Sequence, residues 1–494
     1  MANNKKTAII IGAGIAGLSA AIRMANKGFF VIVFDANDDV GGKLAEKNMN
    51  GFRFDCGPSL FTMPQLFEEL FTECGKNLSD YLHYQKLETI THYFFEDGIR
   101  FDSFSNSEKF AESLVELGLS TSDEIKNYLL KSKANYELTN HVFLEKSLHK
   151  LSSYTNSKTL KSLLQLYKLP LVGSVNSFNE SKFKHPHLVQ YFNRFATYNG
   201  SNPYIAPALL SLIPHLEHNI GAYYPTGGMF SIAKALKSLA IDLSVKFVLN
   251  SKVSSIKIEN EKAVGVVVND LLHKADYVFS NMDIYHTYKK LLPDIKMPKR
   301  VATEEKSSSG IVFFWGINKE FPELGLHNIL FSNDYKTEFE KIFVEKTIGD
   351  DPTIYINITS KYTKHDAPNG NENWFVMINV PHNNGTQSWN ELIADARKSI
   401  INKINRVLKT DIEKLIIVED VLDPILIEAN TSSFGGSLYG SASNSKWAAF
   451  LRHKNFSSDI SNLFFCGGSV HPGGGIPLAM LSGKIAVDCA IQKL

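Results

Sequence analysis

The sequence contains little cysteine and almost no net charge. Its four cysteines, at positions 56, 74, 466 and 489, show no Cys-x-x-Cys spacing. This scarcity excludes a disulfide framework and a zinc ribbon and indicates a reducing compartment. Lys and Arg number 52 against 51 for Asp and Glu, which gives a formal charge of +1. Because a chain that binds a polyanion is usually basic, nucleic acid is not an expected partner.

Long apolar runs and internal repeats are also missing. No run approaches the roughly 18 apolar residues that a membrane-spanning helix needs, and no repeat has the period of about 20–50 residues that marks a solenoid or a propeller. The first residues imitate a signal peptide, but the apolar stretch contains Gly12, Gly14 and Gly17, and no small-residue cleavage site follows it. We therefore expect a protein that is not integral to a membrane, with about two or three structural units in its 494 residues.

The first 35 residues predict one βαβ unit. Residues 7–11 are continuously apolar and β-branched, as in a parallel strand that is covered on both faces. Residues 15–26 have apolar side chains at helical spacing, and Gly28 supplies a left-handed helix stop. A second apolar strand covers residues 30–34 and ends at Asp35. This order predicts an α/β fold that begins with a parallel sheet.

The turn between the first strand and the helix carries a dinucleotide-binding motif. Gly12 permits the tight turn, Gly14 lets the backbone approach a pyrophosphate, and Gly17 lets the helix pack closely on the strand. The helix N-terminus then offers unpaired N–H groups to phosphates. Asp35 stands at the end of the second strand, where a carboxylate accepts hydrogen bonds from ribose hydroxyls. Its charge would repel a 2′-phosphate, which disfavours NADP.

Further glycine-bearing turns favour a flavin over a nicotinamide cofactor. Residues 41–43 and 57–59 follow closely, which suggests a cofactor that extends beyond the first pyrophosphate. The glycine-rich segment 467–477 would offer backbone N–H groups to the electron-rich end of an isoalloxazine ring. No second Gly-x-Gly-x-x-Gly is present, so electrons are expected to come from the substrate and to leave to a diffusible acceptor.

The remaining chain alternates between a helical and a strand-rich pattern. Helical periodicity with polar breaks runs from about residue 81 to 195. The stretch 203–214 is apolar and flanked by prolines; it is predicted to lie in the core, with a partly exposed lip as the alternative. Strands are predicted within residues 245–283 and at 310–317, 352–358, 374–380 and 463–466, followed by a closing helix at 478–492.

Residues 141–195 are strongly basic in an otherwise neutral protein. Two acidic residues, Glu145 and Glu180, stand against eight basic ones, which are Lys146, Lys150, Lys158, Lys161, Lys168, Lys182, Lys184 and Arg194. A solvated helical face is the favoured interpretation, and a patch that docks on an anionic membrane is the alternative.

Several of these segments together carry a family resemblance. They are GAGIAGLSAAIRMANKGFFVIVFDANDDVGGK at the start, FDCGPSLFTMP, and the specific ending FFCGGSVHPGGGIPLAMLSGKIA. The middle agrees in RFATYNGSNPYIAPALLSLI, YYPTGGMFSIAKAL and ADYVFSNMD, so the match covers nearly the whole chain. The sequence resembles the bacterial phytoene-desaturase family of carotenoid oxidoreductases. The form GGSVHPGGGIPL, together with Gly227-Gly228-Met229, is most similar to the hydroxycarotenoid 3,4-desaturase branch.

The resemblance implies a fold and a division into domains. The fold is α/β, with a Rossmann-type FAD-binding domain similar to those of glutathione reductase and amine oxidases, a mixed-sheet substrate domain and a helical region that could face a membrane. Three segments, residues 1–95, 226–290 and 436–494, would form the FAD-binding domain, and residues 96–225 and 291–435 would form the substrate domain. The substrate domain would hold a polyene in a long apolar tunnel.

The resemblance also implies the cofactor-binding residues. The helix start would face the pyrophosphate, Asp35 the adenosine ribose, and the carboxyl-terminal glycines the flavin. The full set is Gly12, Gly14, Ile15, Ala16, Gly17, Asp35, Ala36, Gly41, Gly42, Lys43, Gly57, Pro58, Ser59, Val253, Gly467, Gly468, Gly475, Ile476 and Pro477. Asp35 replaces the more usual Glu, and Gly467-Gly468-Ser469-Val470 replaces the more usual GAGT. FAD is therefore expected to be held less tightly than the motifs alone suggest.

The activity that the resemblance implies is the desaturation of a carotenoid with FAD. A hydride would leave to flavin N5, followed by a proton, to form the C3–C4 double bond near the acyclic end of a 1′-hydroxylated carotenoid. Because the polyene delocalises the positive charge, no strong base is required. The implied partners are the carotenoid, the inner, cytoplasmic face of the membrane, which the protein would bind peripherally, and a diffusible electron acceptor such as oxygen or a quinone.

Polar catalytic candidates are few. Arg194 is expected to cap a helix, with orientation of a substrate end group as the alternative. His471 is expected to fix a turn, with acid–base catalysis as the alternative. His215, Glu217 and His218 do not have a recognised ligand spacing, so no metal is expected.

Three other functions stay open. Phytoene desaturation, or saturation by the reverse reaction, uses the same scaffold. A lipid carrier similar to Rab GDP-dissociation inhibitors would use the fold without flavin redox chemistry, although it would not need the segment HPGGGIP. An amine oxidase would be expected to present an aromatic pair over the flavin, which the sequence does not identify.

Overall fold

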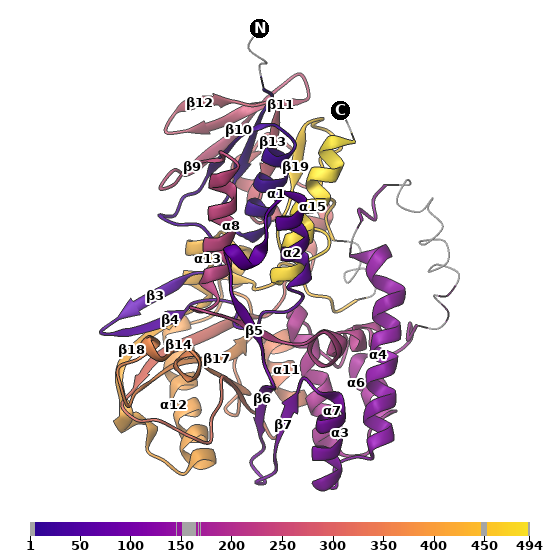
Figure 1. Ribbon diagram of the computed structural model, residues 1–494, viewed down its shortest axis with the longest axis vertical. Coiled ribbons are helices and arrows are strands. Elements are labelled where there is room, and N and C mark those ends of the chain that lie inside the picture. Colours follow the sequence, from indigo (N-terminus) through magenta and orange to yellow (C-terminus); the bar gives the residue numbers. More distant parts are fainter. Residues whose placement is uncertain are drawn as a thin grey trace.

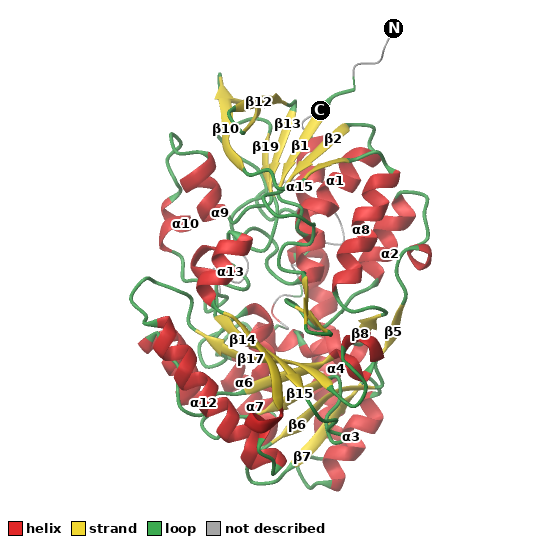
Figure 2. Cartoon of the chain, turned by 90° about the vertical axis from the view of Figure 1, so that its left-hand side faces the viewer, coloured by secondary structure: helices red, strands yellow, loops and turns green. Residues whose placement is uncertain are grey.

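The computed structural model describes residues 5–144, 146–150, 165, 167, 169–445 and 452–492. Two sheets dominate the molecule, one in each half (Figures 1 and 2). The sheets are built from segments that alternate along the chain, so each half contains residues from distant parts of the sequence. The predicted α/β class is confirmed.

The first sheet is parallel and contains every strand of the predicted βαβ unit. Its order is β19-β13-β1-β2-β9. The strands are β1 (Thr7–Ile11), β2 (Phe30–Phe34), β9 (Lys246–Val248), β13 (Tyr277–Ser280) and β19 (Leu463–Phe465). Alternate residues of β1 enter two different cores. Ala8 and Ile10 face the helices, whereas Ile9 and Ile11 face strands β10 (Val253–Glu259) and β11 (Lys262–Val268). A strand buried on both faces requires the continuous apolar run seen in the sequence.

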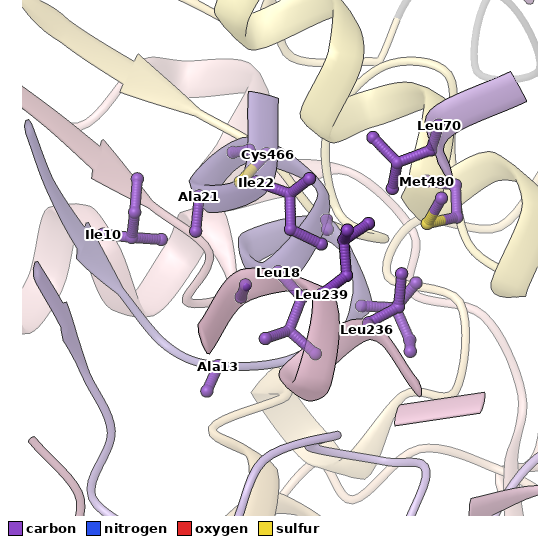
Figure 3. Close-up of a cluster of buried hydrophobic side chains, with 14 of the residues drawn as sticks. Ile10, Ala13, Leu18, Ala21, Ile22, Leu70, Leu236, Leu239, Cys466 and Met480 are labelled. Atoms are coloured by element: carbon purple, nitrogen blue, oxygen red, sulfur yellow. The ribbon is translucent and has the colours of Figure 1, made fainter. Parts of the chain in front are cut away.

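Helices cover one face of this sheet, and a small antiparallel sheet covers the other. The helices are α1 (Ile15–Asn26), α8 (Phe230–Asp242) and α15 (Ile476–Ile491). Figure 3 shows Leu18, Ile22, Leu236, Leu239 and Met480 converging between them. The small sheet consists of β10 (Val253–Glu259), β11 (Lys262–Val268) and β12 (Leu271–Lys274). These layers hold the carboxyl ends of β1 and β2 in place.

The second sheet has the order β18-β14-β17-β16-β15-β6-β7. Its strands are β6 (Thr89–Phe94), β7 (Arg100–Phe104), β14 (Ser309–Ile317), β15 (His327–Leu330), β16 (Ile354–Ile358), β17 (Glu372–Val380) and β18 (Ile416–Leu422). Helix α12 (Trp389–Leu408) covers one face and packs on Phe313 and Trp315. Val312 and Phe314, which alternate with them, lie on the opposite face. That opposite face forms a wall of the cavity described below.

A group of helices lies beside β6 and β7 (Figure 1). They are α3 (Ser107–Glu116), α4 (Ser122–Phe143), α6 (Val175–Glu180) and α7 (Pro186–Asn193). The segment 203–214 packs among them and is mostly buried, as predicted, although Ile205 is 52% exposed. Within the described ranges, no helix is long and apolar enough to cross a membrane.

The remaining elements are short. They are β3 (Glu46–Met49), β4 (Phe52–Asp55), β5 (Tyr84–Lys86), β8 (Tyr223–Pro225), α2 (Gln65–Glu73), α9 (Ile284–His286), α10 (Lys299–Thr303), α11 (Tyr335–Glu340) and α13 (Pro424–Thr431). Residues 194–199 form a 3₁₀ helix and residues 216–220 a π-helical turn.

The helical prediction for residues 81–195 is wrong at its start. Residues 84–104 form β5, β6 and β7 instead. Strand β6 pairs on one side with β7, across the short turn at residues 95–99, and on the other side with β15, where His92 is opposite Asn328. Only the second of these partners is distant in the sequence. The boundary predicted at residue 95 falls between β6 and β7, which are hydrogen-bonded neighbours in one sheet. The division into five segments otherwise stays a prediction.

Candidate active site

A cavity of about 1300 Å³ extends between the two sheets. At one end it reaches the carboxyl ends of β1 and β2, and at the other it reaches the face of β14 to β17 that α12 does not cover. Of the predicted cofactor residues, Gly12, Gly14, Ile15, Ala16, Asp35, Ala36, Gly41, Gly42, Lys43, Gly57, Pro58, Ser59, Val253, Gly467, Gly468, Gly475, Ile476 and Pro477 line it. The tertiary structure therefore brings together segments that are more than 400 residues apart.

The N-terminus of α1 opens onto this cavity without a side-chain cap. Gly12 has φ +95°, a conformation that glycine adopts without strain, and the helix begins directly after Gly14. No acidic residue occupies the first turn of α1, so its N–H groups and positive dipole end are available to an anion. Gly17 does not line the cavity. A Cβ atom there would lie 2.0 Å from the carbonyl oxygen of Gly12, so this glycine serves the packing of helix on strand, as the motif predicts. The cofactor contact that the resemblance implied for Gly17 is therefore wrong.

Asp35 ends β2 and connects it to the glycine turn. Its carboxylate accepts a 2.6 Å hydrogen bond from the N–H of Ala13 and a 2.8 Å bond from the N–H of Asn37. Burial raises the pKa of Asp35, and these backbone donors oppose the rise. Because the carboxylate also borders the cavity, it can accept further hydrogen bonds from a ligand.

The loop at residues 41–43 crosses the cavity wall. Gly41 and Gly42 both have positive φ, and the N–H of Gly41 donates to the carbonyl of Ala13. The Lys43 ammonium donates to the carbonyls of Ser437 (3.0 Å) and Leu438 (2.7 Å). Burial lowers the pKa of Lys43 to about 8. Lys43 thus connects this loop to a segment almost 400 residues away, a role that the sequence did not indicate.

The carboxyl-terminal glycines form a second uncapped helix start. Gly475 has φ +101° and immediately precedes α15, and a Cβ atom there would meet no heavy atom within 4 Å. Gly467 and Gly468 border the same space. Two helix N-termini without side-chain caps, a buried carboxylate and glycine walls fit a long cofactor with a diphosphate, such as FAD.

His471 lies away from the cavity lining. Its Nε2 is 2.8 Å from the carbonyl oxygen of Lys146, and its own carbonyl accepts hydrogen bonds from Asn455 and Ser482. Burial lowers the pKa of His471 to about 4, so the ring is neutral near pH 7. These contacts agree with the expected turn-fixing role and place the imidazole away from any substrate in the cavity.

Arg194 does line the cavity, and its partner is Glu217. Nη2 of Arg194 donates to both carboxylate oxygens of Glu217 at 3.2 Å, and the Tyr198 hydroxyl donates to the same carboxylate. The guanidinium also stacks 4.6 Å from the ring centre of Phe195. Burial raises the pKa of Glu217, and Arg194 opposes the rise. The pair therefore forms a polar patch in a largely apolar wall.

The other two residues considered as metal ligands have separate surroundings. The Nε2 of His218 lies 2.6 Å from the Tyr191 hydroxyl, and His215 packs on the ring of Tyr136. Neither lines the cavity beside Glu217. Within the part of the chain that the structure describes, no group of three or more His, Cys, Asp or Glu side chains could hold a metal ion.

Sequence reasoning missed several residues of the substrate-side wall. They include Thr91 of β6, His327 and Ile329 of β15, Tyr355 of β16, Thr353 just before β16, and Tyr198 of the 194–199 3₁₀ helix. No motif marks them, because their common feature is the face of a sheet whose strands are far apart in sequence.

Comparison with known proteins agrees with this geometry. The family model described as flavin containing amine oxidoreductase matches residues 15–491. The 1-hydroxycarotenoid 3,4-desaturase of Flavobacterium sp. (strain P99-3) is 50% identical over 98% of this chain and 98% of its own length. The 4,4′-diapolycopene oxygenase of Methylomonas sp. is 35% identical over 100% of this chain and 99% of its own. Putrescine oxidase has the same fold, with a TM-score of 0.64 at 16% identity over 99% of each chain.

Proposed function

The chain belongs to the flavin containing amine oxidoreductase family, and on that premise we propose that it is an FAD-dependent carotenoid desaturase. It introduces the C3–C4 double bond near the acyclic end of a 1′-hydroxylated carotenoid. The proposal rests on one continuous cavity. Glycine-rich turns line one end of this cavity, and an apolar sheet face lines the other. The first end suits a dinucleotide, and the second suits a polyene.

The glycine-walled end holds the cofactor. The α1 N-terminus would hold its pyrophosphate, and the Asp35 carboxylate would accept hydrogen bonds from its adenosine ribose. Gly467, Gly468 and the start of α15, which line the same end of the cavity, would hold the isoalloxazine ring. When bound, FAD supplies the hydride acceptor for the removal of two hydrogens from adjacent carbons.

The sheet face aligns and shields the substrate. Val312, Phe314, Phe375 and Met377 present apolar side chains to the cavity. They exclude water and hold the reacting carbons in line with the cofactor. The positive charge left on the polyene is delocalised, so its proton can leave without a strong base.

The enzyme works peripherally on the inner, cytoplasmic face of the membrane, where its apolar substrate dissolves. Support comes from two exposed apolar side chains, Val172 (85% exposed) and Ile205 (52% exposed). They lie on neighbouring segments, which are joined by a 2.9 Å hydrogen bond from the N–H of Val175 to the carbonyl of Ala206. Lys182 and Lys184 are exposed nearby in the chain. Glu145, Lys158, Lys161 and Lys168 of the basic stretch lie outside the described residues. A diffusible acceptor such as oxygen or a quinone reoxidises the cofactor.

Expression in cells that accumulate either phytoene or a 1′-hydroxylated carotenoid tests the proposal. A longer polyene formed only from the hydroxylated pigment is the expected result. Colour formed from phytoene would instead identify a phytoene desaturase. A polar oxidised product would favour an oxygenase, the activity in the name of the 35% identical relative. No conversion by a flavin-free protein would favour a lipid carrier.

A further inference from the structure

Arg452 is a buried cation that has no carboxylate partner among the described residues. Five basic side chains of this part of the chain are buried, and they are Arg23, Arg194, Lys306, Lys403 and Arg452. Each of the first four forms an ion pair with an acidic side chain. Because a buried charge without a counter-charge is unfavourable, the exception at Arg452 calls for an explanation.

The guanidinium of Arg452 lies directly behind the glycine wall of the cavity. Its Nη1 donates to the carbonyls of Tyr439 (2.8 Å) and Gly468 (3.1 Å), and its Nη2 donates to the carbonyl of Ser441 (2.8 Å). Its Nε lies 3.0 Å from the position that a Cβ atom on Gly473 would take. Tyr439 and Gly468 both line the cavity. One layer of backbone therefore separates this charge from the cavity.

Lys43 places a second cation on the same segment. Its ammonium donates to the carbonyls of Ser437 and Leu438, so Lys43 and Arg452 together hold residues 437–441. Within the described part of the chain, Lys43 also donates to carbonyls and not to a carboxylate. Burial lowers the pKa of Lys43 to about 8 and the pKa of Arg452 to about 10. Both side chains are therefore mainly protonated at neutral pH.

The acidic side chains near these two cations offset their charge only in part. Asp283 acts on Lys43, and Glu304 acts on Arg452. Glu304 is already paired with Lys306. Asp283 accepts a 2.9 Å hydrogen bond from the N–H of Tyr285, and burial raises the pKa of Asp283, which disfavours its charged form. The uncapped N-terminus of α15 adds its positive dipole end, so the field at this end of the cavity is positive.

We propose that Arg452 and Lys43 raise the reduction potential of the flavin at the carboxyl-terminal glycines. This inference rests on the proposed function, which places the flavin there. A hydride is a proton with two electrons, so its transfer from a C–H bond adds one negative charge to the acceptor, and the second hydrogen leaves the substrate as a proton. Fixed cations in a medium of low dielectric constant stabilise the added charge.

The chemistry of the substrate explains why such a field is useful. An amine has a nitrogen lone pair beside the C–H bond that breaks, and this lone pair assists the loss of hydride. A carotenoid has no such nitrogen, so a more strongly oxidising acceptor favours the reaction. Arg452 acts through its charge and does not contact the substrate, which makes it a positioning residue for the electrostatics of the site.

The test measures the reduction potential of the bound flavin by equilibration with a reference dye, in the full-length flavin-loaded protein. For Arg452→Met, the potential should become more negative by roughly tenfold in the reduction equilibrium, which is about 30 mV for a two-electron couple. Arg452→Lys keeps the charge and should retain most of the wild-type potential. Arg406→Met is the matched control, since Arg406 is an exposed cation on α12, paired with Glu96, and its loss should leave the potential unchanged.

Flavin content and the thermal unfolding midpoint are recorded for every variant. A folded, flavin-loaded Arg452→Met protein with the wild-type potential would overturn the inference. Equal shifts in Arg452→Met and Arg452→Lys would also overturn it, because they would assign the effect to packing and not to charge. If Arg452→Met does not retain flavin, Lys43→Met and Lys43→Arg decide the question by the same comparison.

Two results with the wild-type protein separate this inference from the proposed function. A protein that binds no added FAD would remove both together, because the cofactor would have no place in the cavity. A flavin-loaded protein that converts no carotenoid would remove the desaturase proposal. A charge-dependent potential in that same protein would still support the role of Arg452 and Lys43.

Discussion

Arg194 and Glu217 form a buried ion pair in the wall of the cavity, with Nη2 of the guanidinium 3.2 Å from each carboxylate oxygen. The sequence offered separate interpretations for them. Arg194 was expected to cap a helix or to contact a substrate end group, and Glu217 was considered as a metal ligand and set aside for its spacing. The pairing explains both residues at once. A buried guanidinium and a buried carboxylate each need the other, because neither charge is stable alone in an apolar wall.

Arg194→Met should therefore destabilise the protein by about 3–5 kcal/mol, since Glu217 would be left buried without a cation. Burial already raises the pKa of Glu217, and loss of Arg194 raises it further. The destabilisation should shrink as the pH is lowered, because protonated Glu217 needs no partner. Urea unfolding of the wild type and of Arg194→Met at two pH values measures this change in the free energy of unfolding. The double variant Arg194→Met/Glu217→Gln should recover part of the loss, and no recovery would contradict the assigned pairing.

Gly14→Val should abolish flavin binding while the protein still folds. Gly14 has φ −69°, so valine meets no backbone strain there. Its side chain would project towards Asn281, whose amide nitrogen lies 2.9 Å from the Cβ position, and into the space at the start of α1. Flavin absorbance after purification is the measurement. Gly349→Val, at a partly exposed glycine outside the cavity, is the control and should remain yellow. A yellow Gly14→Val protein would contradict this placement of the cofactor.

Acid should destabilise the protein in the pH range where the histidines of an unfolded chain become protonated. Burial lowers the pKa of six histidines to about 3 or 4, and these are His215, His218, His327, His382, His453 and His471. In the unfolded chain each returns to a pKa of about 6.5, so between that value and about pH 4 the unfolded state binds more protons. The free energy of unfolding should therefore fall with decreasing pH in this window, by up to about 1.4 kcal/mol per histidine and pH unit.

Urea unfolding from about pH 7.5 to about pH 5 checks this histidine effect. The stability should change little above about pH 6.5 and fall steeply below it. His382→Gln should reduce the slope by about one proton, because it removes one titrating group. A stability that stays constant down to about pH 5 would contradict the burial of these rings as neutral imidazoles.

Val172→Asp should weaken binding to vesicles of anionic lipid. Val172 is 85% exposed, and an acidic residue there would oppose both insertion and charge attraction. Val344→Asp is the matched control, because Val344 is 73% exposed on a different element, the π-helical turn 341–345. Vesicle co-sedimentation at low and high salt separates the two forces. Binding that is insensitive to salt would assign it to the apolar residues, and equal binding of the two variants would remove Val172 from the docking surface.

The glycine motifs predicted much of the cofactor side, and the family match confirms the resemblance that they carried. This was possible because each motif acts locally. Gly12 and Gly475 adopt positive φ whatever surrounds them, and an apolar β-branched run such as β1 is recognisable in isolation. The error at residues 84–104 has the opposite cause. Strand β6 pairs with the adjacent β7 and also with β15, more than 200 residues away, and only the first of these partners lies close enough in the sequence to leave a local pattern.

The amino-acid sequence by itself determined the βαβ start, the glycine turns and the uncapped helix at each end of the cofactor site, because these follow from the backbone preferences of neighbouring residues. Only the tertiary structure decided that Arg194 meets Glu217 and that Ser59, Tyr355 and His327 form one hydrogen-bonded chain. Those contacts depend on how strands β6, β15 and β16 come together in the second sheet. These strands are neighbours in the sheet although β6 is far from the other two in the sequence. Side chains that share a sheet face become neighbours through that assembly, and the face they share is where a substrate would be recognised.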